Sequence, residues 1–299
     1  MFDPQPTEAQ LGIDIDASGR LTTASDLPLL DVAAALGRAG RYLPVDAPRG
    51  DSTVAAALLH PTPGPRALGY GPAWRWVEAV TLSGGRTLSA PDARTLAGLS
   101  EAELLRVSWH SLPLPAAGRT VLGRFRDAEA LARALAPLAA ERPAGLVAVE
   151  LCDRVTARWL IGRDPGLPFT LVLRAEGATE ATALAWRKAW QSVELAGAEA
   201  TDLPRGHWRW GPVAPAGGPP MARLVLEAAP ATLPGLLAAA GELAPLLGGA
   251  AARAQVLLGQ LQVWLPAGPQ LDRALSWLRE RALKAGARWT LAGHPEPGP

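Results

Sequence analysis

The stretch RTVLGRFRDAEALARALAPLAAERPAGLVAVEL, residues 119–151, contains a complete strand-helix-strand unit. Its first part, 119–125, predicts a strand because apolar and β-branched residues dominate it. Asp127 is a natural N-cap for a helix, and LVAVEL at 146–151 predicts a second strand. The helix between them carries one apolar face, which consists of Leu131, Leu135 and Leu138. The stretch therefore predicts a helix packed on a sheet.

The pattern continues toward the C-terminus. Strands are predicted at 157–163 and 169–177, and Thr179 can cap a following helix. The apolar stripe of that helix comprises Ala183, Trp186, Trp190 and Val193. The segment 202–220 is rich in Pro and Gly, which predicts a loop.

A second round follows this loop. Its predicted elements are a strand at 222–228, a helix at about 231–246, a strand at 254–265, a helix at 269–285 and a strand at 287–291. The apolar face of the last helix comprises Leu271, Leu275, Leu278 and Ala282. Two such rounds predict an α+β fold, with a ferredoxin-like sheet that carries helices on one side.

The organisation is different before residue 118. SGRLTTASD at 18–26 predicts a strand, and PLLDVAAALGRAG at 28–40 predicts a helix that ends near Gly40. The face of this helix is predicted from Leu29, Leu30, Ala33 and Leu36. We therefore expect two domains, residues 1–118 and residues 119–299.

Composition excludes several classes of function. The chain has 299 residues, 48% of them hydrophobic, which is enough for a sizeable core. Its formal net charge is +1 and its basic residues are scattered, so no nucleic-acid partner is expected.

The N-terminus lacks a signal-peptide pattern, and Pro234, Glu242, Pro245 and Arg253 interrupt the most apolar segment, 231–265. A cytoplasmic protein without a transmembrane segment is expected.

No metal site is expected either. The four histidines, His60, His110, His207 and His294, do not have the spacing of metal ligands. Cys152 is the only cysteine and lies among apolar residues, which predicts a buried thiol. His207 is open to two interpretations, a catalytic base or a packed loop residue beside Arg209. No catalytic residue can be assigned.

A glycine-rich loop precedes a predicted strand in GPRALGYGPAWRWVEAVTLSGG, residues 64–85. Glycines allow positive φ and close approach of a ligand, so the loop could hold a cofactor. It could equally be a turn-rich connection that binds nothing. The ordered residues of this region are Tyr42-Leu43-Pro44, Asp46, Pro48, Thr53, Gly64-Pro65-Arg66, Tyr70-Gly71, Arg75 and Gly85.

This string resembles the FAD-linked oxidase family of PCMH type, especially the E subunits of bacterial glycolate oxidases. The resemblance covers the second flavin subdomain of that family at roughly 20–90 and extends weakly to the C-terminus. It implies that FAD, if bound, contacts Thr53, Ala55, Ala56, Gly64, Tyr70, Gly71 and Arg75.

The sequence differs from the pattern of that family at three places. Only about 19 residues precede the first predicted strand, so the family's first flavin subdomain is expected to be missing. Ala55 and Ala56 replace paired glycines, and Trp76 replaces an aspartate. The flavin-lining segment that should follow the Gly-Gly turn is reduced to SAPDARTLAGLSEAEL at 89–104.

The resemblance therefore implies an accessory subunit of a flavin-dependent 2-hydroxy-acid (glycolate) oxidase complex, with impaired FAD binding. Its expected partners are a flavin oxidase catalytic subunit and an iron–sulfur subunit. One alternative is an FAD-binding oxidoreductase that retains the flavin with help from a partner chain. Another is a small-ligand-binding α+β protein with no flavin.

Overall fold

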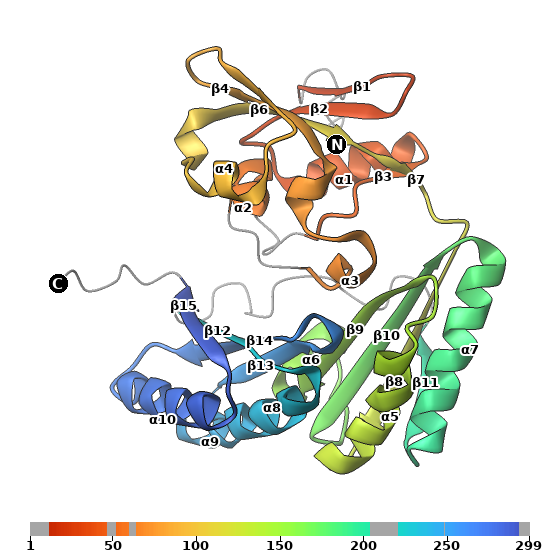
Figure 1. Ribbon diagram of the computed structural model, residues 1–299, viewed down its shortest axis with the longest axis vertical. Coiled ribbons are helices and arrows are strands. Elements are labelled where there is room, and N and C mark those ends of the chain that lie inside the picture. Colours follow the sequence, from red (N-terminus) through yellow and green to blue (C-terminus); the bar gives the residue numbers. More distant parts are fainter. Residues whose placement is uncertain (1–11, 47–51, 60–63, 204–220, 248, 293–299) are drawn as a thin grey trace, which may run out of the picture. The chain divides into compact units, whose positions relative to one another are not determined.

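The computed structural model divides the chain into two compact units, Met1–Pro115 (unit 1) and Ala116–Pro299 (unit 2). Each is described by itself, and most elements of both are labelled in Figure 1. The structure describes residues 12–46, 52–59, 64–203, 221–247 and 249–292. His60, His207, Arg209 and His294 lie outside the described residues, as does most of the predicted loop 202–220.

Unit 1 is built on a five-stranded antiparallel sheet of order β1-β2-β6-β4-β5. These strands are β1 (Ile13–Ile15), β2 (Arg20–Ala24), β4 (Val77–Leu82), β5 (Thr87–Ser89) and β6 (Leu104–His110). A short separate ribbon pairs β3 (Arg41–Tyr42) with β7 (Leu112–Pro113). The predicted strand at 18–26 is therefore confirmed as β2.

Short helices complete unit 1, and they enclose its apolar core. They are α1 (Leu29–Arg38), α2 (Val54–Leu59), α3 (Ala67–Tyr70), η1 (Ala73–Trp76), α4 (Ala93–Ala97) and η2 (Glu101–Glu103). Trp109 of β6 is completely buried in this core, together with Leu21 and Leu36.

The predicted inner face of α1 was partly wrong. The helix buries Leu29, Val32, Ala35 and Leu36, whereas Leu30 is 55% exposed and Ala33 also faces solvent. The helical period was predicted correctly, but the predicted buried face was rotated around the helix axis relative to the observed one. Two neighbouring stripes of this helix are apolar, and only packing decides which of them faces the core.

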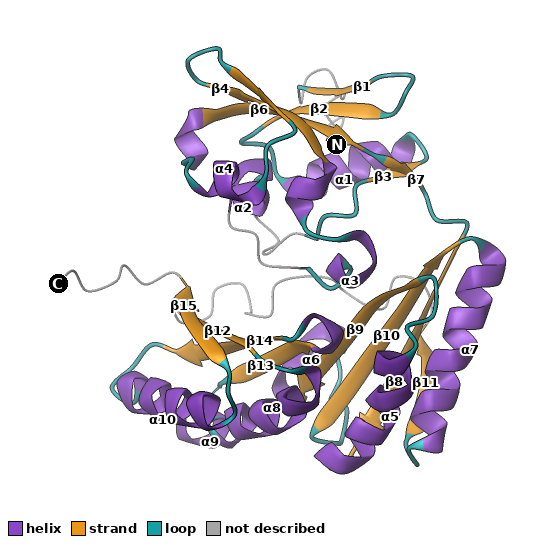
Figure 2. Ribbon diagram, viewed as in Figure 1, coloured by secondary structure: helices purple, strands orange, loops and turns teal. Residues whose placement is uncertain are grey.

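Unit 2 contains one eight-stranded antiparallel sheet, of order β11-β8-β10-β9-β13-β14-β12-β15 (Figure 2). The strands are β8 (Ala117–Phe125), β9 (Leu146–Asp153), β10 (Phe169–Gly177), β11 (Glu199–Leu203), β12 (Met221–Glu227), β13 (Ala251–Gln255), β14 (Gln260–Pro266) and β15 (Arg288–Ala292). Helices of this unit are α5 (Ala128–Ala140), α6 (Arg154–Ile161), α7 (Thr179–Leu195), α8 (Leu233–Glu242), α9 (Ala244–Leu247) and α10 (Leu271–Lys284).

This sheet is two ferredoxin-like halves joined at their edges. The first half, β8-α5-β9-β10-α7-β11, has the strand order β11-β8-β10-β9. The second half, β12-α8-β13-β14-α10-β15, has the corresponding strands in the reverse order across the sheet, β13-β14-β12-β15. The two halves meet where β9 pairs with β13, and this junction is here called the seam. The predicted α+β fold, with its two rounds of strands and helices, is confirmed.

The two faces of the sheet differ in chemistry. Gly123 and Phe125 point toward α7, since a Cβ on Gly123 would lie 2.9 Å from Val193. Because side chains alternate along a strand, Leu122 and Cys152 point the other way, where they pack against Ala157 of α6. The first of these faces is the helix-covered face. The second, which α6 covers in part, is here called the polar face.

The local predictions for the first half of unit 2 were mostly correct. The side chain of Asp127 accepts a 2.8 Å hydrogen bond from the Ala130 N–H, so it caps α5, and all three predicted leucines of α5 are buried. The segment 157–163, predicted as a strand, instead falls largely in helix α6. Asp153 caps that helix, because its side chain accepts a hydrogen bond from the Thr156 N–H.

Three other expectations were also wrong. Residues 254–265 form the end of β13, a turn at Val256–Leu258 and β14, because Gly259 takes a positive φ of 71° and reverses the chain. Thr179 is the first residue of α7 and makes no side-chain cap. That helix buries Ala185 and Ala189 in place of Trp186 and Trp190, since small residues let it approach the sheet.

Among the described residues, one apolar stretch, Pro230–Leu247, is long enough to cross a membrane by length and composition alone. In the structure it is not one continuous helix, because α8 ends at Glu242 and α9 starts at Ala244. Leu233, Leu236 and Leu237 of α8 are buried, and α8 contacts β13 and β14.

Candidate functional site

The start of α2 carries Ala55 and Ala56, two of the predicted cofactor residues. Ala55 is 2% exposed and belongs to the core of unit 1, whereas Ala56 is half-buried. Backbone N–H groups at this point are all engaged by the protein. The bonds are Val54 N to Leu27 O (2.9 Å), Ala55 N to Ser25 O (2.8 Å), Ala56 N to Thr53 Oγ1 (3.0 Å) and Ala57 N to Thr53 O (3.0 Å).

This geometry does not fit a flavin held by the backbone at α2. A phosphate or a flavin carbonyl that approaches the start of a helix needs N–H groups pointing at it. Here the four donors of 54–57 have acceptors within unit 1. The Ala55 methyl group also occupies core space instead of a ligand surface.

Gly64 has a packing role. A Cβ at Gly64 would lie 2.2 Å from the Cβ of Asp46, so no other residue fits without a shift. Asp46 in turn accepts hydrogen bonds from the Arg66 backbone N–H (2.9 Å) and from Arg66 Nε (2.8 Å). The Asp46 side chain is 4% exposed, so this ion pair is held away from solvent. Gly64 therefore allows the pair to form.

Tyr70, Gly71 and Arg75 gather at the turn between α3 and η1. Gly71 has a positive φ of 79°, which glycine adopts without strain. A Cβ at Gly71 would lie 3.1 Å from Cδ of Arg75, and the Arg75 side chain is exposed. Because α2 contacts η1, the helix that carries Ala55 and Ala56 lies beside the turn that carries Arg75.

An aromatic row runs through this region. It consists of Tyr42, Tyr70, Trp76 and His110. The ring centres of Tyr42 and Tyr70 are 5.8 Å apart, edge to face, and those of Tyr70 and Trp76 are 6.4 Å apart. Trp76 stacks on His110 at 6.3 Å with an interplanar angle of 10°. Trp76 Nε1 also donates to the Tyr70 carbonyl oxygen at 3.0 Å, which fixes the indole in place.

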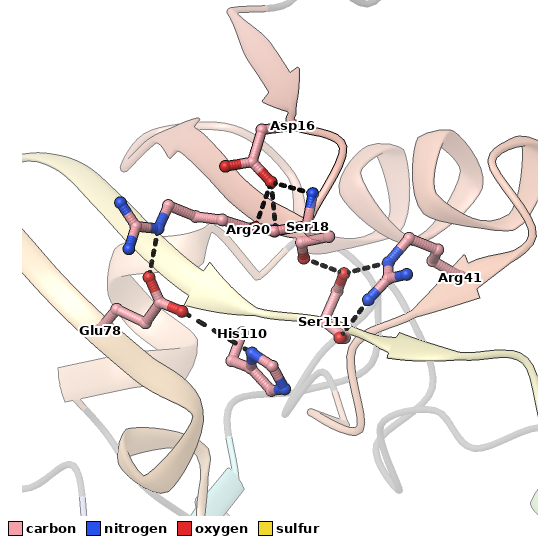
Figure 3. A network of polar contacts seen from close by, with 8 residues as sticks. Asp16, Ser18, Arg20, Arg41, Glu78, His110 and Ser111 are labelled. Carbon is pink, nitrogen blue, oxygen red and sulfur yellow. Dashed lines mark hydrogen bonds and ion pairs between the residues drawn. The ribbon is translucent and has the colours of Figure 1, made fainter.

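Polar groups surround the His110 end of the row, as Figure 3 shows. Glu78 forms an ion pair with Arg20, and His110 Nδ1 lies 3.7 Å from Glu78 Oε1. On the next residue of the chain, the Ser111 hydroxyl donates to the Gly19 carbonyl and accepts from Arg41 Nε at 2.7 Å. The sequence pattern does not predict that His110 and Glu78 are neighbours, because they come from adjacent strands far apart in sequence.

Unit 2 carries a second polar cluster, on the polar face of its sheet. Glu150 of β9, Arg253 of β13 and Gln262 of β14 have side chains on this face, and all three are buried. Arg253 Nη2 donates to Gln262 Oε1 at 3.3 Å, and Arg253 Nε lies 3.6 Å from Glu150 Oε1. The strand register explains the cluster. Arg253 lies directly opposite Gln262, and Glu150 lies opposite Gln255, which is two residues from Arg253 on the same face of β13.

Two further residues extend the cluster along β12 and β14. Arg223 lies opposite Trp264 in the register, and the Arg253 guanidinium lies 5.7 Å from the Trp264 ring centre. Burial lowers the pKa of Arg223, and the nearby charge of Arg253 lowers it further. The strand register therefore places two guanidinium groups, those of Arg223 and Arg253, on one face of the sheet. Guanidinium groups pair with carboxylates through two parallel hydrogen bonds.

Metal chemistry has no support in the part of the chain that the structure describes. No group of three His, Cys, Asp or Glu residues there is placed to hold an ion. Cys152 is fully buried, and burial raises the pKa of its thiol well above its usual value, with the Glu150 charge adding to the shift.

Comparisons with known proteins place the fold. Two solved structures of alkyldihydroxyacetonephosphate synthase match with TM-scores of 0.67 and 0.70, each at 12% identity over 92% of this chain. A chitooligosaccharide oxidase structure matches with a TM-score of 0.64 at 12% identity over 93% of this chain. No family model and no curated protein sequence matches.

At 12% identity these likenesses establish the fold. The chain shares its α+β fold with these synthase and oxidase structures, whereas the finer resemblance to glycolate oxidase E subunits has no counterpart among the three. The chain spans 60% and 61% of the synthase chains and 70% of the oxidase chain.

Proposed function

We propose that this chain is an accessory subunit of a flavin-dependent complex that oxidises 2-hydroxy acids such as glycolate, and that the catalytic flavin is held on another chain. The observation that carries the proposal is the start of α2. Its N–H groups are bonded within unit 1, and Ala55 packs into the core, so the family's glycine cradle is closed. The fold is retained without this backbone contact to a flavin.

The buried Arg253 and the half-buried Arg223 of unit 2 support an acid as the ligand class. A 2-hydroxy acid presents a carboxylate, which guanidinium groups bind with two parallel hydrogen bonds. Arg253 is oriented by Glu150 and Gln262, and Arg223 is a second guanidinium on the same face of the sheet. In this proposal Arg223 and Arg253 bind and orient the carboxylate, and Glu150 acts as a positioning residue.

A second candidate function is an FAD-binding oxidoreductase that binds the cofactor with help from a partner chain. The observation in its favour is the turn at 70–75, where Gly71 and the exposed Arg75 lie beside the aromatic row. Planar rings and a cation are groups that a flavin and its phosphates contact in proteins. A small-ligand-binding protein without flavin is the third alternative.

The cofactor question is tested by titrating the purified chain with FAD and following flavin fluorescence and absorbance. We expect little or no saturable binding. The double variant Ala55→Gly/Ala56→Gly shows whether the missing glycines alone account for the loss. Stoichiometric yellow cofactor after gel filtration would contradict the accessory role and favour the second candidate.

The ligand class is tested by calorimetric titration with glycolate and lactate, with ethylene glycol as the uncharged analogue. We expect the acids to bind and the diol not to bind. Arg223→Gln should weaken binding at least tenfold, because a charge-assisted hydrogen bond contributes about 1.5–3 kcal/mol. Arg288→Gln, on the edge strand β15 with its side chain 87% exposed, is the matched control. Equal affinity in both variants would exclude the arginine site.

The partner is tested by co-expressing this chain with a flavin oxidase catalytic subunit and an iron–sulfur subunit from the same source organism. The proposal expects the three proteins to co-purify. Trp76→Ala is the first interface variant, and Trp208→Ala is the second, although Trp208 lies outside the described residues. Failure of the wild-type chain to associate would contradict the accessory-subunit proposal.

A further inference from the structure

A hollow lies between α8–α9 and α10 in unit 2. It has a volume of about 460 Å³, within the range of small-molecule sites. Its apolar lining includes Leu243, Leu246 and Leu247 from the α8–α9 side and Ala274 and Trp277 from α10. A neighbouring hollow of about 550 Å³ shares Trp277. The residues that line this hollow are separate from those of the candidate site described above.

The apolar wall of this hollow is only partly covered by the protein. Leu243 is 4% exposed, but Leu246, one turn further on, is 71% exposed. The stretch Pro230–Leu247 to which both belong is only 39% buried. An exposed leucine at the mouth of an apolar hollow is a surface that a bound aliphatic group would remove from water.

The rim of the same hollow is cationic. Arg273 and Arg281 of α10 line it, and Glu242 is the only acidic residue among the described residues of its lining, so the rim has one excess positive charge. The Arg281 guanidinium lies 4.3 Å from the Trp277 ring centre and 3.8 Å from Glu242. Stacking on the indole holds this cation beside the apolar floor.

We propose that this hollow binds a single-chain anionic amphiphile, namely a medium-chain carboxylate such as decanoate. The carboxylate lies at Arg273 and Arg281, and the aliphatic chain covers Leu246, Leu247 and Trp277. Charge complementarity selects the head group, because the rim offers guanidinium groups. The limited volume of the hollow suits one chain. This inference does not depend on the proposed oxidase function.

Calorimetric titration of the full chain with decanoate, below its micelle concentration, tests the proposal. Butyrate keeps the charge but lacks the long chain, and decanol keeps the chain but lacks the charge. We expect saturable binding of decanoate, with both analogues at least tenfold weaker. No binding of decanoate, or equal binding of decanol, would overturn the proposal.

Two pairs of variants locate the site. Leu246→Asn and Arg273→Gln should each weaken decanoate binding about tenfold, which corresponds to about 1.4 kcal/mol. Leu195→Asn on α7, where the leucine is 86% exposed, and Arg133→Gln on α5 are the matched controls. All four positions are at the surface, and thermal unfolding verifies that each variant folds. Unchanged affinity in the first pair would place the binding elsewhere and overturn the proposal.

A flotation assay with phosphatidylglycerol vesicles separates a free amphiphile from a membrane surface. We expect no stable flotation, because the hollow accommodates a single chain and not a bilayer. Flotation that Leu246→Asn abolishes, together with no binding of free decanoate, would show a bilayer-docking surface instead.

Discussion

The Asp153 carboxylate accepts a 2.9 Å hydrogen bond from the backbone N–H of Ala252, and this contact crosses the seam between the two halves of unit 2. The other carboxylate oxygen accepts from the Thr156 N–H at 2.7 Å and caps α6. One side chain therefore links β9, β13 and the helix on the polar face. Burial raises the pKa of Asp153 to about 6, because the loss of hydration outweighs the stabilising effect of these N–H donors.

Stability should depend on pH through Asp153. Because its pKa is about 6 in the folded protein, against an ordinary aspartate value of 3.8, the folded state binds the proton more tightly than the unfolded state. The contribution of this group is therefore most favourable below pH 4 and is lost as the pH rises from about 4 to about 6. The loss is at most about 3 kcal/mol. Urea unfolding between pH 4 and 7 should show this slope in the wild type, and Asp153→Asn should reduce it.

Removing the link should destabilise the seam at any pH. Asp153→Ala leaves the Ala252 and Thr156 N–H groups without their acceptor, which we expect to cost about 2–4 kcal/mol. Asp127→Ala, which removes only the exposed cap of α5, is the matched control and should cost about 1 kcal/mol. Equal losses in the two variants would show that the seam contact adds nothing beyond a helix cap.

Gly123 of β8 should not tolerate a methyl group. A Cβ there would lie 2.8 Å from Phe125 and 2.9 Å from Val193 of α7, so the helix or the sheet has to shift. We expect Gly123→Ala to lower the free energy of unfolding by about 1–3 kcal/mol. Gly37→Ala in α1, where no atom lies within 4 Å, should raise it by about 0.5–1 kcal/mol. Denaturant titration of both variants measures the contrast.

Cys152 should react slowly with a thiol reagent in the native state. Its side chain is fully buried, and burial raises its thiol pKa, so the reactive thiolate is scarce. Ser83→Cys in the exposed turn after β4 supplies a reactive thiol in the same protein for comparison. Labelling of Cys152 at a rate close to that in denaturant would contradict its burial.

The aromatic row should contribute to the stability of unit 1. Trp76 is half-buried, stacks on His110 and donates a hydrogen bond to Tyr70, so Trp76→Ala should cost about 2–3 kcal/mol. His110→Ala removes only the exposed end of the row and should cost less than about 1 kcal/mol. Unfolding followed by tryptophan fluorescence compares the two, and equal costs would exclude a structural role centred on Trp76.

The candidate site was predictable from the sequence only in part. The resemblance that selected Tyr70, Gly71 and Arg75 identified residues that do lie together, since they are neighbours along one turn. It also selected Ala55, which the structure places in the core, because position in a motif does not show which way a side chain points. The sequence pattern did not predict that His110 contacts Glu78, or that Arg223 and Arg253 share one face of the sheet in unit 2.

Periodicity and caps within a short window were enough to predict the β8-α5-β9 unit, the inner face of α5 and the apolar setting of Cys152. The pairing of β9 with β13, and with it the contact between Glu150 and Arg253, is visible only in the folded protein. Local patterns do not predict it, because this strand pairing joins residues about a hundred positions apart. Register, and not local propensity, then decides which polar side chains share a face.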